Sequence, residues 1–425
     1  MHMGGTGSFN STTNRITSSA YKSSPLLVFA MSDFQAALDS LSNMTDGVVP
    51  ISVDEYRARM QKAQSLMKEH GVDAMYIHGG TNLYYFTGLK WNPSERMVAA
   101  ILPADGEPNY IAPRFELDTL RDYWQIEGDI FAWEEHESPF ALVKKLLAEK
   151  KVSGPTIAID GSAPFFIVDG LQKEMPDHQF VTAQPISDAC RQCKSDAEIA
   201  MIKQAHLMTM KVIESAASIL KPGISTSEVT KFIDDAHRKV GAPAGSYFCI
   251  VLFGVATSFP HGVKDPQILK EEDWVLIDTG FLLQGYNSDI TRTFPFGKAT
   301  AKQAEIWSLE RDAQIAAFEA AQIGAPCEAI DAAARKTLEA SGLGPNYDLP
   351  GLPHRTGHGC GLDIHEAPYV VRGNATPLES GMVASIEPMI VVPGEFGVRL
   401  EDHFYMTTAG PQWFTEPARS MEDLF

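Results

Sequence analysis

Apolar positions recur along this chain with two different periods, and their order predicts helices and strands that alternate in the first half. After Ser52 they recur every three or four residues as far as Met67, which is the spacing of one face of a helix. Ser52 and Glu55 have the spacing of a capping box, which satisfies backbone N–H groups at the start of a helix. A continuous apolar run at residues 74–77 then predicts a buried strand.

The same reasoning extends this α/β pattern to about residue 185. Asp105 and Gly106 form a turn signal between two apolar runs, which predicts a β-hairpin. Further elements are expected at residues 97–103 (strand), 109–113 (strand), 140–149 (helix) and 156–159 (strand). We therefore expect a first domain at residues 31–185.

A second domain is expected at residues 186–425. Ser195 and Glu198 form another capping box, and apolar residues at helical spacing follow it. The boundary therefore falls between about residues 183 and 195. Residues 1–30 are rich in Ser, Thr, Asn and Gly, and we expect them to be a tag or an over-extended start rather than part of either domain.

The composition of the 425 residues is that of a globular protein and argues against several classes of function. The formal net charge of −19 argues against nucleic acid or an anionic membrane as the main partner. No apolar run approaches the ~18 residues that indicate a transmembrane helix. The five cysteines are sparse and odd in number, which suits a reducing compartment, so we expect a cytoplasmic location. Cys190 and Cys193 form an isolated CxxC pair, which we interpret as structural or incidental.

Two acidic residues stand in strand-like sequence in the second domain. Asp278 ends a long apolar run, and Asp289 follows eleven residues later in another strand-like stretch. If the intervening turn centres on Leu283 and Gln284, the two aspartates face each other. If it centres on Gln284 and Gly285, they are diagonal neighbours. Either register puts both on one face, with Cβ atoms roughly 4.5–8 Å apart, where they repel each other unless a proton or a cation lies between them.

A cluster of histidines and two further acids complete a candidate metal site. His354, His358 and His365 lie within twelve residues, interleaved with glycines that let the backbone approach other groups closely. Glu387 and Glu401 then follow apolar runs, as Asp278 does.

Four carboxylates and one imidazole are enough to hold two divalent cations. The set is Asp278, Asp289, His358, Glu387 and Glu401, and its charge balances that of two such ions. Oxygen-rich ligands with one nitrogen suit Mn²⁺, with Co²⁺, Zn²⁺ or Fe²⁺ as alternatives. Two metal ions can lower the pKa of a bridging water and polarise a carbonyl group. The implied chemistry is metal-assisted hydrolysis.

The motifs around these residues resemble those of the M24 metallopeptidases, the pita-bread family that includes methionine aminopeptidase, aminopeptidase P and prolidase. The resemblance rests on the spacing of the two aspartates, the block GHGCGLDIHEAP at residues 357–368, IEP around Glu387 and VRLED around Glu401. Residues 82–88 (NLYYFTG) are similar to a segment of the creatinase-like N-terminal domain, which methionine aminopeptidases lack. The resemblance therefore implies an α/β (α+β) fold, with a creatinase-like N-terminal α/β domain followed by a C-terminal pita-bread metallopeptidase domain.

Carried over position by position, the resemblance assigns the four acids and His358 as metal ligands. Glu387 would also carry a proton from the water to the leaving nitrogen, and His365 would stabilise the tetrahedral intermediate or bind the substrate. His354 and His261 would be further histidines of the substrate pocket.

Two arginines and a threonine complete the expected site. Arg372 and Arg399 are candidates for binding the carboxylate of a dipeptide, because a guanidinium binds a carboxylate in a bidentate manner. A structural salt bridge explains either arginine equally well. Thr291 would orient Asp289 through a hydrogen bond.

The sequence restricts the substrate less than it restricts the metal site. The short interval between Glu387 and Glu401 resembles that of compact microbial prolidases, so the leading hypothesis is cleavage of Xaa-Pro dipeptides by a metal-bound hydroxide. The alternatives are aminopeptidase P activity on longer Xaa-Pro peptides and the activity of an M24 relative on a non-peptide substrate. A metal-free binding module of the same fold is a different class, and it is disfavoured because such relatives have lost ligands that this chain keeps.

A homodimer is also implied by the resemblance to creatinase-like proteins, in which the N-terminal domain of one subunit borders the site of the other. Tyr84, Trp91 and Arg96 are candidates to reach the partner's pocket. Core packing is the alternative explanation for Tyr84.

Overall fold

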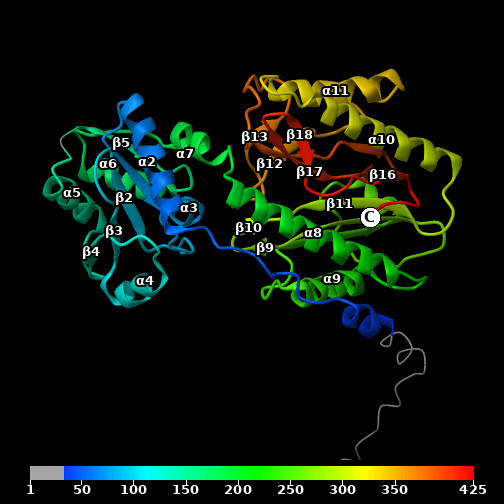
Figure 1. Ribbon diagram of the computed structural model, residues 1–425, viewed down its shortest axis with the longest axis horizontal. Coiled ribbons are helices and arrows are strands. Elements are labelled where there is room, and N and C mark those ends of the chain that lie inside the picture. Colours follow the sequence, from blue (N-terminus) through cyan, green and yellow to red (C-terminus); the bar gives the residue numbers. More distant parts are fainter. Residues whose placement is uncertain (1–32, 153) are drawn as a thin grey trace, which may run out of the picture.

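The computed structural model describes residues 33–152 and 154–425, which form two α/β units (Figure 1). The prediction for residues 1–30 lies outside the described residues. Within the described part of the chain, no helix combines the length and the apolar character needed to cross a bilayer.

The first unit is a six-stranded mixed sheet with helices on both faces. Its strands run in the order β4 (Asp129–Trp133), β3 (Asn109–Pro113), β2 (Ala99–Pro103), β1 (Ala74–His78), β5 (Thr156–Ile159) and β6 (Gln179–Thr182). Its helices are α2 (Val53–Glu69), α3 (Thr81–Thr87), α4 (Leu117–Tyr123), α5 (Pro139–Glu149), α6 (Phe165–Glu174) and α7 (Gln184–Arg191). These elements confirm the predicted helix after Ser52 and the predicted strands.

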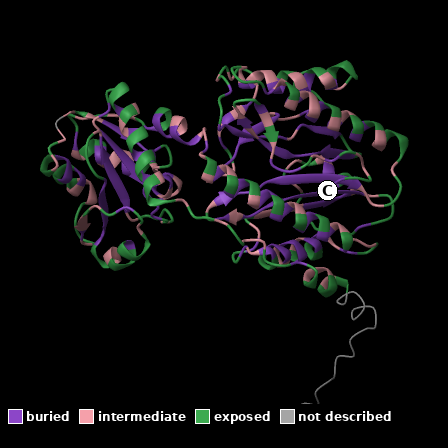
Figure 2. Ribbon diagram, in the orientation of Figure 1, coloured by how far each residue is buried: buried purple, intermediate pink, exposed green. Residues whose placement is uncertain are grey.

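The central strand β1 explains why this sequence is apolar without alternation. Met75 and Ile77 pack on one face of the sheet with residues of α2, whereas Ala74 and Tyr76 pack on the other face with residues of α5 and α6. Because both faces are covered, every side chain of the strand is buried. Figure 2 shows the same burial for the neighbouring strands.

The helix α7 belongs to the first unit by its packing. Ile186 and Cys190 lie in the core that α2 covers. The next helix begins at Asp196, after the Ser195 capping box that the sequence predicted. We therefore propose a boundary between Arg191 and Asp196, within the range of 183–195 that the sequence indicated.

The second unit consists of short antiparallel sheets between two pairs of helices. In Figure 1, α8 (Asp196–Ser218) and α9 (Thr226–Val240) lie below the strands, and α10 (Ala301–Ala320) and α11 (Cys327–Ala340) lie above them. One sheet contains β11 (Ile290–Pro295), β8 (Trp274–Gly280) and β7 (Phe248–Phe253), and another contains β14 (Val383–Ile386), β17 (Asp402–Thr407) and β18 (Gly410–Trp413). Three two-stranded sheets pair β9 (Leu282–Leu283) with β10 (Tyr286–Asn287), β12 (Gly357–Gly359) with β13 (Glu366–Val370), and β15 (Met389–Val392) with β16 (Phe396–Arg399).

Candidate metal centre

The strands β8 and β11 fix the positions of the two aspartates. Thr291 lies directly opposite Asp278 in this antiparallel pair, and Asp289 comes just before β11 on the same face. The turn between the strands centres on Gln284 and Gly285, which have positive φ angles of 52° and 92°. Tight hairpin turns of this kind need positive φ at both central residues. Of the two registers that the sequence allowed, the structure has the one in which the aspartates are diagonal neighbours.

Of the other three candidate ligands, one lies in a strand and two lie between consecutive strands. His358 lies in β12, Glu387 separates β14 from β15, and Glu401 separates β16 from β17. The backbones of Glu401 and Thr291 are bridged, which joins the second group of strands to the aspartate hairpin. Ser385 ties two ligands together, because its hydroxyl accepts a hydrogen bond from the His358 backbone N–H at 2.9 Å and donates one to Glu387 Oε1 at 3.2 Å.

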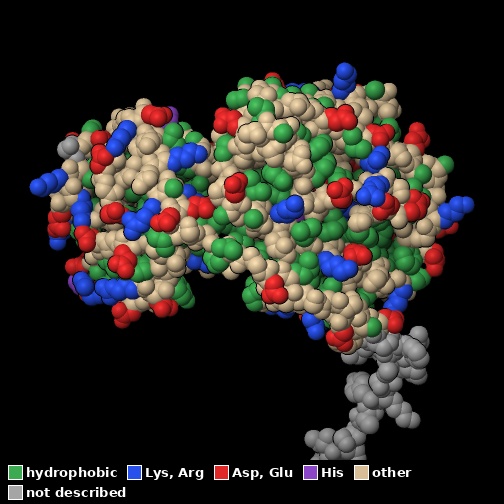
Figure 3. All heavy atoms as spheres, viewed as in Figure 1, with side chains coloured by type: hydrophobic (Ala, Val, Ile, Leu, Met, Phe, Trp, Pro, Cys, Tyr) green, Lys and Arg blue, Asp and Glu red, His purple; other side chains and the backbone are tan. Residues whose placement is uncertain are grey.

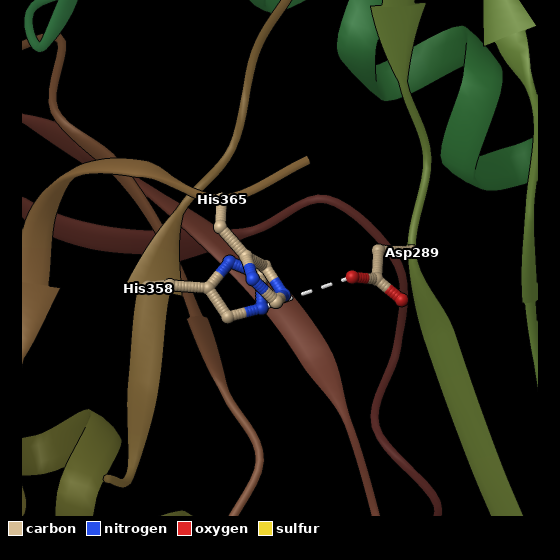
Figure 4. Close-up of side chains that lie close together, drawn as sticks. All are labelled: Asp289, His358 and His365. Atoms are coloured by element: carbon tan, nitrogen blue, oxygen red, sulfur yellow. Dashed lines mark ion pairs between the residues drawn. The ribbon is translucent and has the colours of Figure 1, made fainter. Parts of the chain in front are cut away.

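The side chains of these residues converge in one place. His358 Nε2 lies 2.9 Å from Glu387 Oε1, 3.8 Å from Asp289 Oδ2 and 4.0 Å from Glu401 Oε1. Figure 4 shows the Asp289 carboxylate pointing toward His358 and His365. The ligand atoms of His358, Glu387 and Glu401 lie within 4.8 Å of one another, as do those of Asp289, His358 and His365.

The electrostatics of the cluster favour a cation. Burial, opposed in part by Arg399, raises the pKa of Asp278 to about 7. Burial and the neighbouring Glu387 raise the pKa of Glu401 to about 7, and burial with Glu401 raises that of Asp289 well above its ordinary value. Asp278 Oδ1 is buried and has no hydrogen-bond partner among the described residues. A largely buried set of four carboxylates and one imidazole fits divalent metal ions, because such ions supply the missing positive charge.

Arg399 is engaged by the metal centre itself. Its guanidinium forms an ion pair with Asp278, donates from Nε to Thr291 Oγ1 at 3.2 Å and donates to the Pro260 carbonyl oxygen at 3.1 Å. The Thr291 hydroxyl in turn donates to Glu401 Oε2 at 2.7 Å. The prediction that Thr291 forms a hydrogen bond with Asp289 is therefore wrong, because the threonine hydroxyl donates to Glu401. The backbone bridge between Thr291 and Glu401 places the threonine hydroxyl beside the glutamate.

A cavity of about 680 Å³ opens onto these ligands. It is lined by Asp278, Asp289, His358, Glu387, Glu401, His261, His354, His365 and Arg399, among others. Arg372 does not line it. That arginine is exposed and donates to Asn346 Oδ1 at 2.8 Å, so the structure does not bring it to the other candidate residues.

His365 and His354 face this cavity with different environments. The ring of His365 lies 4.0 Å from that of His358, and burial together with His358 and Arg355 lowers its pKa to about 4. The His365 ring is therefore neutral near pH 7 and can donate a hydrogen bond. The Nδ1 atom of His354 lies 2.7 Å from the Arg355 carbonyl oxygen, an acceptor that holds the proton on Nδ1.

Sequence reasoning missed two residues of the site. Arg355 lines the cavity with its guanidinium 4.6 Å from the centroid of the Tyr369 ring. His403 is buried with Nε2 3.2 Å from Glu401 Oε1. Its position two residues after Glu401 was a usable signal, because alternate residues of a strand share a face. Arg355 directly follows His354, which the resemblance to the family had already assigned to the substrate pocket.

Comparison with known proteins gives this geometry a family. Metallopeptidase family M24 matches the chain over residues 200–408, and the Creatinase/Prolidase N-terminal domain matches residues 59–193. The chain therefore belongs to metallopeptidase family M24, and its creatinase-type and pita-bread domains are those that the sequence predicted.

Individual relatives cover nearly the whole of both domains. The chain is 35% identical over 360 residues to the "Putative dipeptidase YkvY" of Bacillus subtilis (strain 168), which covers 84% of this chain and 97% of that protein. The structure is similar to that of dipeptidase PepE from Mycobacterium ulcerans, with a TM-score of 0.80, 30% identity and coverage of 88% of this chain and 98% of that one. It is also similar to a prolidase from Thermococcus sibiricus, with a TM-score of 0.78, 29% identity and coverage of 85% and 97%.

Proposed function

We propose that this M24 peptidase is a dinuclear-metal hydrolase that cleaves the Xaa-Pro bond of dipeptides. The observation that carries the proposal is the convergence of three buried carboxylates, the partly buried Glu387 and His358 in the lining of one cavity, which also includes His261, His354 and His365. The relatives named as dipeptidases and as a prolidase support a dipeptide as the substrate.

The chain supplies the ligands and the groups that move protons. The four carboxylates and His358 would hold two divalent ions, Mn²⁺ in our proposal, with Co²⁺, Zn²⁺ and Fe²⁺ as alternatives. When bound, these ions would supply an activated water molecule and positive charge at the substrate carbonyl. Glu387 would accept the proton of that water and pass it to the leaving nitrogen. Neutral His365 would donate a hydrogen bond to the carbonyl oxygen as negative charge develops there.

The carboxylate of a dipeptide needs a cation at the cavity wall, and Arg355 is the best placed. Arg399 is already paired with Asp278 at the metal centre, and Arg372 lies outside the cavity. Among the contacts of the described residues, the guanidinium of Arg355 has the Tyr369 ring as its partner and no carboxylate. We therefore assign substrate carboxylate binding to Arg355 in place of the two arginines that the sequence suggested.

A second hollow of about 650 Å³ shares Phe248, Ile250 and His261 with the metal cavity. This additional space is the reason to test longer peptides alongside dipeptides. His261 stands where the two hollows meet, so we propose that it contacts the substrate.

The test is a substrate panel. Protein stripped of metal and reloaded with Mn²⁺ would be assayed on Xaa-Pro dipeptides, on dipeptides without proline and on Xaa-Pro-Xaa tripeptides. We expect cleavage of the Xaa-Pro dipeptides above the other two classes. Preference for tripeptides would make the protein an aminopeptidase P, and metal-dependent cleavage without a need for proline would make it a general dipeptidase.

A further inference from the structure

A buried ion cluster joins the two units directly behind the loop that carries His365. Arg191, at the end of α7, pairs with Asp363 at 2.7 Å and also with Glu366. Lys194, in the link to α8, pairs with Glu366 at 2.6 Å. The carboxylates of this cluster therefore flank His365 in the sequence, two residues before it and one residue after it.

The cluster is closed to solvent at its centre. The side chain of Lys194 is 1% exposed and that of Glu366 is 8% exposed. Burial raises the pKa of Glu366, but Lys194 and Arg191 outweigh it and lower the pKa below its ordinary value. The glutamate is therefore charged, and removing one cation leaves a buried carboxylate only partly compensated.

Arg191 is anchored in the first unit, whereas the backbone N–H of Lys194 donates to the Gly381 carbonyl oxygen of the second unit at 2.8 Å. The Nη1 atom of Arg191 donates to Asn82 Oδ1 at 2.9 Å, and the Nδ2 atom of Asn82 donates to Asp160 Oδ1 at 2.9 Å. Thr81, at the start of α3, donates to Asp363 Oδ1 at 2.6 Å. The loop of residues 363–366 is thus held by Arg191 and Thr81 of the first unit and by Lys194 of the link, although its histidine faces the cavity of the second unit.

We propose that Arg191 and Lys194 are positioning residues for catalysis, which fix the His365 ring beside the metal centre by clamping Asp363 and Glu366. The inference rests on the proposed peptidase function and gives the first domain a part in it. Neither cation lines the cavity, so neither touches the substrate. Their effect passes through the backbone on both sides of His365, where a displacement of about 1 Å can cost about 10²-fold in rate.

A double-mutant cycle separates this role from a merely structural one. We expect Arg191→Met to lower kcat about 10- to 100-fold with a much smaller change in KM. In a His365→Ala background, the same substitution should lower the residual kcat by less than about twofold, because residues that act as a unit are not additive. Equal losses in both backgrounds would overturn the proposal.

Arg59→Met is the matched control. Arg59 is another buried arginine of the first unit that pairs across the domain boundary, with Glu198 at 3.4 Å, and it does not contact the His365 loop. Arg59→Met should change kcat by the same factor in the unmodified protein and in the His365→Ala background. If Arg191→Met does not fold, Thr81→Val removes the hydrogen bond to Asp363 with little change of volume, and it should show the same non-additivity at a smaller size.

A measurement that does not depend on catalysis tests this inference separately from the proposed function. Hydrogen exchange of the backbone amides of residues 361–370 should be faster in Arg191→Met than in the unmodified protein and unchanged in Arg59→Met. If the unmodified protein cleaves no peptide, the proposed function fails, and this exchange experiment alone decides whether the clamp fixes the loop. Unchanged exchange in Arg191→Met overturns the proposal in either case.

Discussion

Asp278 and its neighbours illustrate how single residues prepare the metal centre. One oxygen of Asp278 is paired with Arg399 and the other is buried without a partner in the described part of the chain. A divalent cation would satisfy the second oxygen and relieve the repulsion among the four carboxylates. Metal binding should therefore stabilise the fold.

Metal removal is the first prediction at this scale. At a free ion concentration one hundredfold above Kd, each bound Mn²⁺ should add about 2.7 kcal/mol to the free energy of unfolding. Thermal unfolding of chelated and reloaded protein measures this, and Asp289→Asn should lose most of the increase. An equal melting temperature with and without metal would contradict a preformed cation site.

Arg355→Gln is the second prediction. Loss of a charge-assisted hydrogen bond to the substrate carboxylate costs about 1.5–3 kcal/mol, so KM for an Xaa-Pro dipeptide should rise by about 10- to 100-fold. Steady-state kinetics measure this rise, and it should disappear for the C-terminal amide of the same dipeptide. Arg372→Gln is the matched control and should leave KM unchanged. An effect of Arg355→Gln that persists with the amide would assign this arginine a structural role.

The candidate ligands were predictable because the acids stood at the end of apolar runs or in strand-like sequence and His358 belonged to a cluster of histidines. Arg355 and His403 were missed because they stand beside residues that had already been interpreted. The partner of Thr291 was predicted wrongly because it depends on a backbone bridge to Glu401, 110 residues away in the chain. Burial alone does not indicate which carboxylate a hydroxyl reaches.

Among the elements, those with a local signal were predicted well. The capping residues Ser52 and Ser195 each begin a helix as expected, because their hydroxyls accept from the backbone N–H three residues later. The hairpin register stayed open in the sequence, since a turn centred on Leu283 and Gln284 and a turn centred on Gln284 and Gly285 were both compatible with it. The positive φ angles at Gln284 and Gly285 settle it in the structure.

The helix α9 provides a prediction about pH. His237 is buried, and its Nδ1 and Nε2 atoms lie 2.8 Å from Ser246 Oγ and 3.4 Å from Thr209 Oγ1. Burial, opposed in part by Asp234, lowers its pKa to about 4. The folded state thus binds fewer protons than the unfolded state between pH 6.5 and 4, and this histidine removes about 3 kcal/mol of stability as the pH falls through that range.

Denaturant unfolding at several pH values tests this expectation. The loss of stability between pH 6.5 and 4 should be smaller in His237→Gln than in the unmodified protein, because glutamine does not titrate. Curves with the same pH dependence for both proteins would show that His237 binds a proton equally well when folded.

For the whole molecule, contacts between the two domains were beyond the sequence. Arg191 and Glu366 are 175 residues apart, and nothing in either local pattern pairs them. On the face shown in Figure 3, lysines and arginines are interspersed with acidic side chains.

The homodimer stays a prediction. Tyr84 donates to the Gln284 carbonyl oxygen of its own chain, and Arg96 pairs with Glu135, so Trp91 is the candidate least engaged at its polar end. Light scattering should give twice the 46.5 kDa of one chain, and Trp91→Ala should change KM more than metal content. A monomer that is fully active would contradict the shared site.

The most direct test of the central claim is the dependence of Xaa-Pro dipeptide hydrolysis on bound Mn²⁺. Protein stripped of metal would be titrated while bound metal and initial rate are both measured, with Asp289→Asn as the control. We predict no hydrolysis by the stripped protein and a maximal rate at two bound ions per chain. Asp289→Asn should neither bind two ions nor hydrolyse the dipeptide. Full activity in the stripped protein, or in Asp289→Asn at any metal concentration, would contradict a hydrolase built on this cluster.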